Sequence, residues 1–146
     1  MDIDFQVSVI ISPMLNIQKK LNKYSLNPNN SVVIGSGILN ALKLREINDI
    51  DILVEPETYN RLLKLPEFKI KNTSGLDMLT SDILEIGTTL NVGNHSYNFE
   101  ELFENSIVID KVRYITLEFL LDIKKQWLRD KDKKDIEIIE KYLKHH

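Results

Sequence analysis

The sequence predicts a mixed α/β domain, in which a β-sheet is flanked by helices and closed by two C-terminal helices. Apolar runs of strand length alternate with apolar residues at helical spacing as far as residue 115, and only helical spacing follows. No internal repeat and no low-complexity linker interrupts this order. We therefore expect one domain over residues 1–146, with a core at about 31–115 and C-terminal helices at about 116–144.

Composition limits the classes of protein to consider. The 146 residues are 42% hydrophobic and 28% charged with a net charge of −3, values typical of a globular domain with an ordinary core. The absence of cysteine excludes disulfides, thiol catalysis and thiolate zinc sites. No apolar stretch reaches the ~20 residues of a membrane span, and no secretory signal opens the sequence. We expect a cytoplasmic protein without a membrane partner.

The N-terminal third predicts strands and helices in alternation. Phe5–Ile11 is a strand or an irregular lead-in, and Ser12-Pro13 then begins a helix that ends before Asn27-Pro28. The expected elements that follow are a strand over 31–34, a short helix with Ile38, Leu39 and Leu42, a strand over 49–54, and a helix with Tyr59, Leu62 and Leu63.

The remaining elements include one ambiguous stretch. A strand is expected over 75–80, whereas 83–91 is left unassigned because Gly87 and Gly93 interrupt its pattern. A short helix over 97–103 precedes a hairpin that turns at Asp110-Lys111. Caps at Thr116 and Asp132 then begin the two C-terminal helices.

A glycine–serine turn follows the first core strand. The apolar run Val32-Val33-Ile34 stops at Gly35-Ser36, directly before a helical segment. Backbone N–H groups at the start of a helix lack acceptors within it and can bind an anion such as phosphate. The alternative is an ordinary strand-to-helix turn, because the spacing matches neither a P-loop nor a dinucleotide fingerprint.

Asp49 and Asp51 form the strongest chemical signal in the sequence. Their spacing places both carboxylates on one face of a strand, with Ile50 and Ile52 on the other. Hard oxygen ligands of this kind suit Mg²⁺ or Mn²⁺, and paired metals can activate phosphoryl chemistry. The alternative is an exposed edge strand with a solvated acidic face, although the strand is unusually apolar for that position.

A two-metal site needs a third carboxylate, and Asp77 is the candidate that we select. It lies within the apolar run Leu76–Leu79 on an expected strand, where an acid must be paired, hydrated or metal-bound. Asp82 and Glu85 are the competitors, in surroundings that look more polar and turn-like.

Lys124 is the one charged residue inside an apolar helical stripe. The stripe comprises Leu117, Leu120, Leu121, Lys124, Trp127 and Leu128. A lysine there either extends its amine to solvent at the edge of the stripe or points into a cleft, where it would neutralise a triphosphate. The charged run Arg129–Asp135 is interpreted as a solvated helix junction, with Asp132 and Asp135 in capping roles.

Taken together, these segments resemble the DNA polymerase beta-like nucleotidyltransferase superfamily, especially its small prokaryotic and toxin–antitoxin-associated group. The matching segments are Ile34-Gly35-Ser36, Asp49-Ile50-Asp51, Leu76-Asp77-Met78-Leu79-Thr80, Ile115–Lys124 and Arg129–Ile136. The sequence departs from the family pattern in a slightly long spacing before Asp49, and in Leu128, where a small residue often precedes the arginine.

The resemblance implies a nucleotidyltransferase-like mixed sheet flanked by helices, and an enzyme that transfers a nucleoside monophosphate from a nucleoside triphosphate to an acceptor hydroxyl. By analogy, Asp49, Asp51 and Asp77 would be catalytic and would bind Mg²⁺ or Mn²⁺. Gly35 and Ser36 would bind the β- and γ-phosphates, together with Lys124.

The acceptor and the protein partners stay open. RNA, protein and small molecules are all candidate acceptors, and either a second copy of the chain or a toxin-like protein would be the partner. The alternative to an enzyme is a non-catalytic protein that retained the fold, as an antitoxin-like partner or as a nucleotide sensor.

Overall fold

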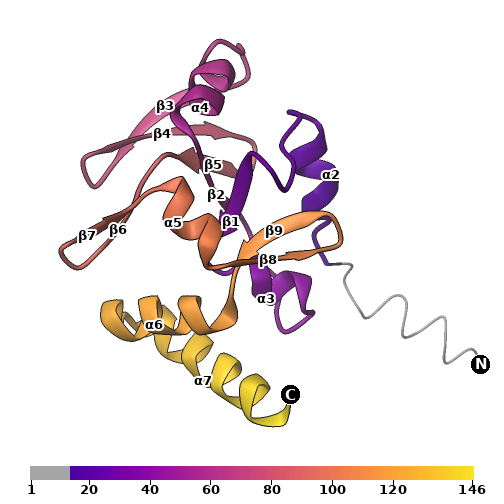
Figure 1. Cartoon of the computed structure of the whole chain (residues 1–146), viewed down its shortest axis with the longest axis vertical. Helices are drawn as coiled ribbons and strands as arrows, with labels where there is room; N and C mark the ends of the chain where they lie inside the picture. Colours follow the sequence, from indigo (N-terminus) through magenta and orange to yellow (C-terminus); the bar gives the residue numbers. More distant parts are fainter. Residues whose placement is uncertain (1–13) are drawn as a thin grey trace, which may run out of the picture.

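The computed structural model describes residues 14–146, which form six helices and nine strands (Figure 1). The helices are α2 (Ile17–Asn22), α3 (Gly37–Ala41), α4 (Pro56–Leu63), α5 (Phe99–Glu104), α6 (Leu117–Trp127) and α7 (Asp130–His145). The strands are β1 (Ser31–Ile34), β2 (Ile50–Val54), β3 (Lys69–Thr73), β4 (Leu76–Ser81), β5 (Leu84–Gly87), β6 (Leu90–Val92), β7 (His95–Tyr97), β8 (Ser106–Ile109) and β9 (Val112–Ile115).

The expectations for Phe5–Ile11 and for a cap at Ser12-Pro13 lie outside the described residues. Within them, Asn16 caps α2 by accepting from the Lys19 N–H at 3.0 Å.

Seven strands form one mixed sheet in the order β3-β4-β5-β2-β1-β9-β8. The pairs β1–β9 and β2–β5 are parallel, and the remaining neighbours are antiparallel. The two remaining strands, β6 and β7, form a separate hairpin (Figure 1). This architecture confirms the predicted fold class: a mixed sheet with flanking helices and two C-terminal helices.

The middle of the sheet is the most buried part of the described chain. All four residues of β1 are buried, and in β2 every residue except Asp51 is buried. Runs that are apolar on both faces are typical of strands covered on both sides. β1 contacts both α3 and α5, and β2 contacts α4. The polar exception, Asp51, is therefore held on a rigid strand.

The C-terminal helices pack against each other, and α6 also contacts β6 (Figure 1). The hydroxyl of Thr116 caps α6 as expected, accepting from the Phe119 N–H at 3.1 Å. The second cap differs from its prediction, because α7 begins at Asp130 and Asp132 lies in its first turn. Leu128 was expected on the buried stripe but is 56% exposed, with φ of 49° between the two helices.

Four strands, β3, β5, β6 and β7, differ from the predicted order, and β7 lies where no strand was predicted. β3 was not predicted, and each of its residues is exposed, so no alternation of apolar and polar residues marks it. The ambiguous stretch 83–91 resolves into β5 and the start of β6, separated by a short connection after Gly87. The predicted hairpin is confirmed, with Asp110 and Lys111 both at positive φ in its turn.

No helix in the described part of the chain is both long enough and apolar enough to cross a membrane.

Candidate functional site

A pocket of about 380 Å³ lies between one end of the central strands and the C-terminal helices. Gly35 follows the last residue of β1, while Asp51 and Glu85 are near the beginning of β2 and β5. Because β1 runs antiparallel to β2, and β5 runs parallel to β2, these three positions meet at the same end of the sheet. Lys124 and Asp135, from α6 and α7, line the other side.

Three carboxylates gather at this end of the sheet: Asp49, Asp51 and Glu85, which we call the carboxylate cluster. Asp51 lies opposite Glu85 in the parallel ladder of β2 and β5. Asp49 precedes β2 and is exposed, whereas Asp51 and Glu85 are half-buried. Asp49 and Asp51 therefore line the same pocket, although Asp49 lies just before the strand rather than on it.

The charge of Asp51 is poorly compensated. Its pKa is raised from 3.8 to about 7, chiefly by burial and also by the neighbouring carboxyls of Asp49 and Glu85, while Lys131 opposes the shift. Within residues 14–146, neither Asp49 nor Asp51 forms an ion pair, and Glu85 has only a long contact of 3.9 Å with Lys71. A buried acid without a cationic partner is costly unless a ligand supplies the positive charge.

The glycine–serine turn contacts the cluster directly. Gly35 has φ of +62°, and a Cβ added there would lie 3.0 Å from Asp51 Oδ2. Glycine is favoured both by this conformation and by this close approach. The first N–H groups of α3 follow this turn and have no acceptor inside the helix. The Ser36 hydroxyl is already used, because it donates to Asp135 Oδ2 at 3.0 Å.

The structure does not bring Asp77 to this pocket, which corrects its expected place as the third carboxylate. Asp77 is exposed on β4 and accepts a hydrogen bond from Asn72 Nδ2 at 3.0 Å. The pairing of β4 with β5 begins only at Leu79. Asp77 therefore lies in the part of β4 that pairs with β3 alone. Glu85, which the sequence analysis named as a competitor of Asp77, is the carboxylate that lines the pocket beside Asp49 and Asp51.

A buried ion network joins the C-terminal helices to the turn. Lys124 Nζ lies 2.9 Å from Asp135 Oδ2 and 3.3 Å from Asp132 Oδ1. Arg45 donates to both carboxylate oxygens of Asp135, at 2.7 and 2.8 Å, and Arg129 binds Asp132 in the same bidentate manner. We call these five residues the ion network.

The ion network corrects two expectations. Asp132 and Asp135 are 0% and 3% exposed, so they do not belong to a solvated junction. Burial alone would raise the pKa of Asp135, but the hydrogen bonds and charges of Arg45 and Lys124 lower it to about 2. Lys124 does point into the molecule and line the pocket, yet its charge is balanced by two carboxylates.

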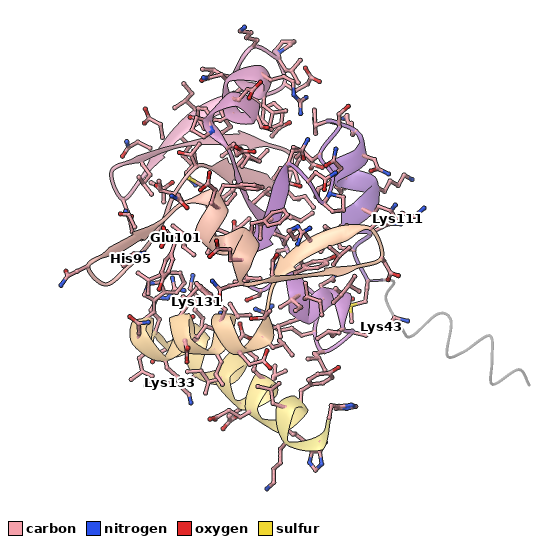
Figure 2. The ribbon with its side chains drawn as sticks, viewed as in Figure 1. Lys43, His95, Glu101, Lys111, Lys131 and Lys133 are labelled. Carbon is pink, nitrogen blue, oxygen red and sulfur yellow. The ribbon has the colours of Figure 1, made fainter. Side chains whose placement is uncertain are left out.

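Lys131 is a pocket cation that the sequence analysis did not select. Among the described residues it forms no ion pair, whereas Arg45, Lys124 and Arg129 are all paired within the ion network. Figure 2 shows Lys131 on the side of the C-terminal helices that faces the sheet, and its charge reaches Asp51. It is the pocket-lining cation best able to meet a new anion.

The pocket also has an apolar wall, of which the sequence analysis placed Leu120 and Trp127 in the apolar stripe of a helix. Leu90 and Trp127 line it and are half-buried, while Leu120 and Ile123 are buried behind them. The expected helical stripe explains why Trp127 looked like a core residue, since it lies at the end of that stripe, where α6 stops.

The donor set fits a cation that arrives with a phosphate ligand. Asp49, Asp51 and Glu85 offer the hard oxygen atoms that Mg²⁺ or Mn²⁺ prefers. Nowhere in residues 14–146 do three His, Cys, Asp or Glu side chains form a group that could hold a metal ion alone. Mg²⁺ is usually bound through one or two carboxylates together with water and substrate phosphates, so fewer than three protein ligands are compatible with such a cation.

Comparison of this chain with protein-family models, with curated proteins and with solved structures finds no match in any of the three. The resemblance to nucleotidyltransferases therefore stays a prediction from the sequence.

Proposed function

We propose that this chain is a nucleotidyltransferase, which transfers a nucleoside monophosphate from a nucleoside triphosphate to an acceptor hydroxyl. The observation that carries the proposal is the half-buried, unpaired Asp51 between Gly35 and Glu85. A rigid carboxylate whose charge is uncompensated needs a cation, and the adjacent turn suits the phosphates that would accompany one.

Different residues of the pocket would bind the cation and the phosphates. Asp49 and Asp51 would hold Mg²⁺ or Mn²⁺, and Glu85 takes the role that the sequence resemblance gave to Asp77. The bound cation would stabilise the charge that develops on the phosphate oxygens. The backbone N–H groups after Gly35 would hold the β- and γ-phosphates, with Lys131 in place of Lys124 as the free positive charge.

The transfer is an in-line displacement at the α-phosphorus. The acceptor oxygen forms a bond to phosphorus as the bond to the bridging oxygen breaks, and pyrophosphate leaves with that electron pair. The hydroxyl proton passes to a carboxylate oxygen of Glu85, which lies beside Asp51 in the ladder. Most of the acceleration would come from alignment and preorganised charge.

One observation favours a second candidate function, a protein that binds nucleotides without transfer. The described residues contain no group of three ligating side chains that could hold a metal ion. An incomplete set would let a nucleoside triphosphate bind with its cation but leave the acceptor unactivated. An antitoxin-like protein and a nucleotide sensor both belong to this class, and a nucleoside triphosphate ligand suits the cytoplasmic location expected from the sequence.

The direct test is transfer of labelled α-phosphate to a panel of RNA, protein and small-molecule acceptors, with Mg²⁺ or Mn²⁺. We expect incorporation into at least one acceptor class, and a loss of about 100-fold or more in Asp51→Asn and Glu85→Gln. Asp77→Asn is the matched control and should keep the wild-type rate. Nucleotide binding without incorporation into any acceptor would support the second candidate instead.

A further inference from the structure

The lining of the pocket is of two chemical kinds. The carboxylate cluster and the glycine turn are one kind, and the half-buried apolar side chains of Leu90 and Trp127, which we call the apolar end, are the other. A triphosphate and its cation occupy only charged surroundings, so they leave the apolar end without a partner. An accessible apolar wall that continues a polar site is typical of small-molecule pockets.

Trp127 is held in place by groups outside the apolar wall. The Arg129 guanidinium lies over the indole, with its Cζ 4.4 Å from the ring centroid. Arg129 is in turn fixed by Asp132, which accepts from Nε at 2.7 Å and from Nη2 at 3.0 Å. The indole is therefore preorganised by the ion network, which reduces the entropy lost when a ligand packs against it.

We propose that the apolar end of the pocket is a nucleobase subsite, in which Trp127 and Leu90 contact the base of the nucleoside triphosphate. The inference rests on the proposed function, because the base arrives there attached to the triphosphate. The pocket volume of about 380 Å³ falls within the range of about 300–1,000 Å³ that is usual for small-molecule sites. Aromatic contact with a flat base tolerates any of the four bases, so affinity rather than base choice is assigned to this wall.

The chain carries its own reporter for this subsite, since Trp127 is its single tryptophan. Tryptophan emission is recorded during titration with α,β-methylene nucleoside triphosphates and Mg²⁺, and separately with tripolyphosphate and Mg²⁺. We expect each nucleotide to change the emission and to bind about 5- to 100-fold more tightly than tripolyphosphate. Equal affinity for the nucleotides and for tripolyphosphate would overturn the subsite.

Two variants separate contact with the base from a structural role of Trp127. By calorimetry, Trp127→Leu should weaken nucleotide binding about 5- to 100-fold and leave tripolyphosphate binding within about twofold of wild type. Trp127→Phe keeps an aromatic ring and should retain most of the nucleotide affinity. Equal weakening of both ligands in Trp127→Leu, or no weakening of either, would contradict the subsite.

The subsite and the proposed function fail in different ways. Transfer activity with no preference for nucleotides over tripolyphosphate removes the subsite and leaves the function. A clear preference with no transfer to any acceptor removes the function and leaves the subsite. If neither ligand binds the wild-type chain, both are wrong.

Discussion

The carboxylate cluster and the ion network meet at the same pocket, yet the pKa values of their buried acids Asp51 and Asp135 are shifted in opposite directions. Burial and neighbouring carboxyls raise the pKa of Asp51 to about 7. Burial acts on Asp135 in the same direction, but Arg45 and Lys124 overcome it and lower the pKa to about 2. The same side chain is therefore unsatisfied on the sheet and fully paired on α7.

This difference separates structural charge from functional charge. The acids of the ion network satisfy the cations around them, so they hold α6 and α7 against the turn at Ser36. The carboxylate cluster has no comparable cation, so the cost of its buried charge is relieved either by protonation or by a ligand that brings positive charge. Strongly raised pKa values in a cleft are a recognised mark of functional sites.

The largest effect expected on stability comes from breaking the ion network. Asp135→Asn leaves Lys124 buried and removes the bidentate partner of Arg45, which should lower the free energy of unfolding by about 3–5 kcal/mol. Urea denaturation measures the change. Glu140→Gln is the control on the same helix, because its pair with Lys125 is exposed and should contribute less than about 1 kcal/mol. A loss below about 1 kcal/mol in Asp135→Asn would contradict a structural role.

Neutralising Asp51 should increase the free energy of unfolding, whereas neutralising Asp135 should decrease it. Its raised pKa means that the folded state binds a proton more tightly than the unfolded chain, so stability falls as pH rises from about 4 to about 7. Asp51→Asn removes this cost and should raise the free energy of unfolding at pH 8 by about 2–4 kcal/mol in the absence of ligand.

Thermal unfolding of Asp51→Asn across pH 4–8 would test this sign. The gain should become small near pH 4, where wild-type Asp51 is protonated in the folded state and partly protonated in the unfolded chain. Asp77→Asn is the control at an exposed position and should show no such gain. An Asp51→Asn protein that is less stable than wild type at pH 8 would show that the carboxylate is satisfied.

Alanine variants at two glycines separate the effect of the close approach at the turn from the effect of backbone strain. Gly35 and Gly75 both have positive φ, but an added Cβ would contact Asp51 only at Gly35 and would meet nothing within 4 Å at Gly75. Alanine at either position should cost about 1–2 kcal/mol of stability. Only Gly35→Ala should also reduce stabilisation by Mg²⁺ and a nucleoside triphosphate. Equal ligand stabilisation in the two variants would remove the turn from the site.

The smallest effect on stability is expected at Lys131. Because it is exposed and forms no ion pair within the described residues, Lys131→Gln should change the free energy of unfolding by less than about 0.5 kcal/mol. Calorimetry should nevertheless show about fivefold weaker binding of a nucleoside triphosphate with Mg²⁺. Lys133→Gln, which changes a lysine paired with Asp130, should bind as wild type does. Identical affinities in the two variants would exclude Lys131 from phosphate binding.

Most of the fold could be predicted because its central elements carry local signals. The runs at 31–34 and 49–54 are apolar and bounded by turn residues, and Thr116 is an ordinary helix cap. β3 could not be predicted in this way, because an exposed edge strand is defined by its partner β4 rather than by its own residues.

The third carboxylate depended on register, which a single sequence does not reveal. Asp77 lies in an apolar run but outside the paired length of β4 and β5. Glu85 lies between Leu84 and Ile86, the same alternation that marks Asp51 between Ile50 and Ile52, and this signal could have selected it.

The sequence pattern indicates the ion network less clearly than it indicates Glu85. Asp132, Asp135 and Ile139 recur at helical spacing and form the buried face of α7, although three of the surrounding residues are lysines. Leu128 also takes on meaning only in the structure. Its φ of 49° is a left-handed conformation that favours glycine, and the leucine residue gives no sign of it.

The most direct test of the central claim, that the carboxylate cluster binds a cation together with a triphosphate, is thermal unfolding with Mg²⁺ and an α,β-methylene nucleoside triphosphate. At about 100 times the dissociation constant, the pair should stabilise the wild-type chain by about 2.7 kcal/mol, and Mg²⁺ alone should contribute far less. Asp51→Asn should abolish this rise in melting temperature, while Asp77→Asn keeps it. An unchanged melting temperature in the wild type, or an equal rise in Asp51→Asn, would contradict the account.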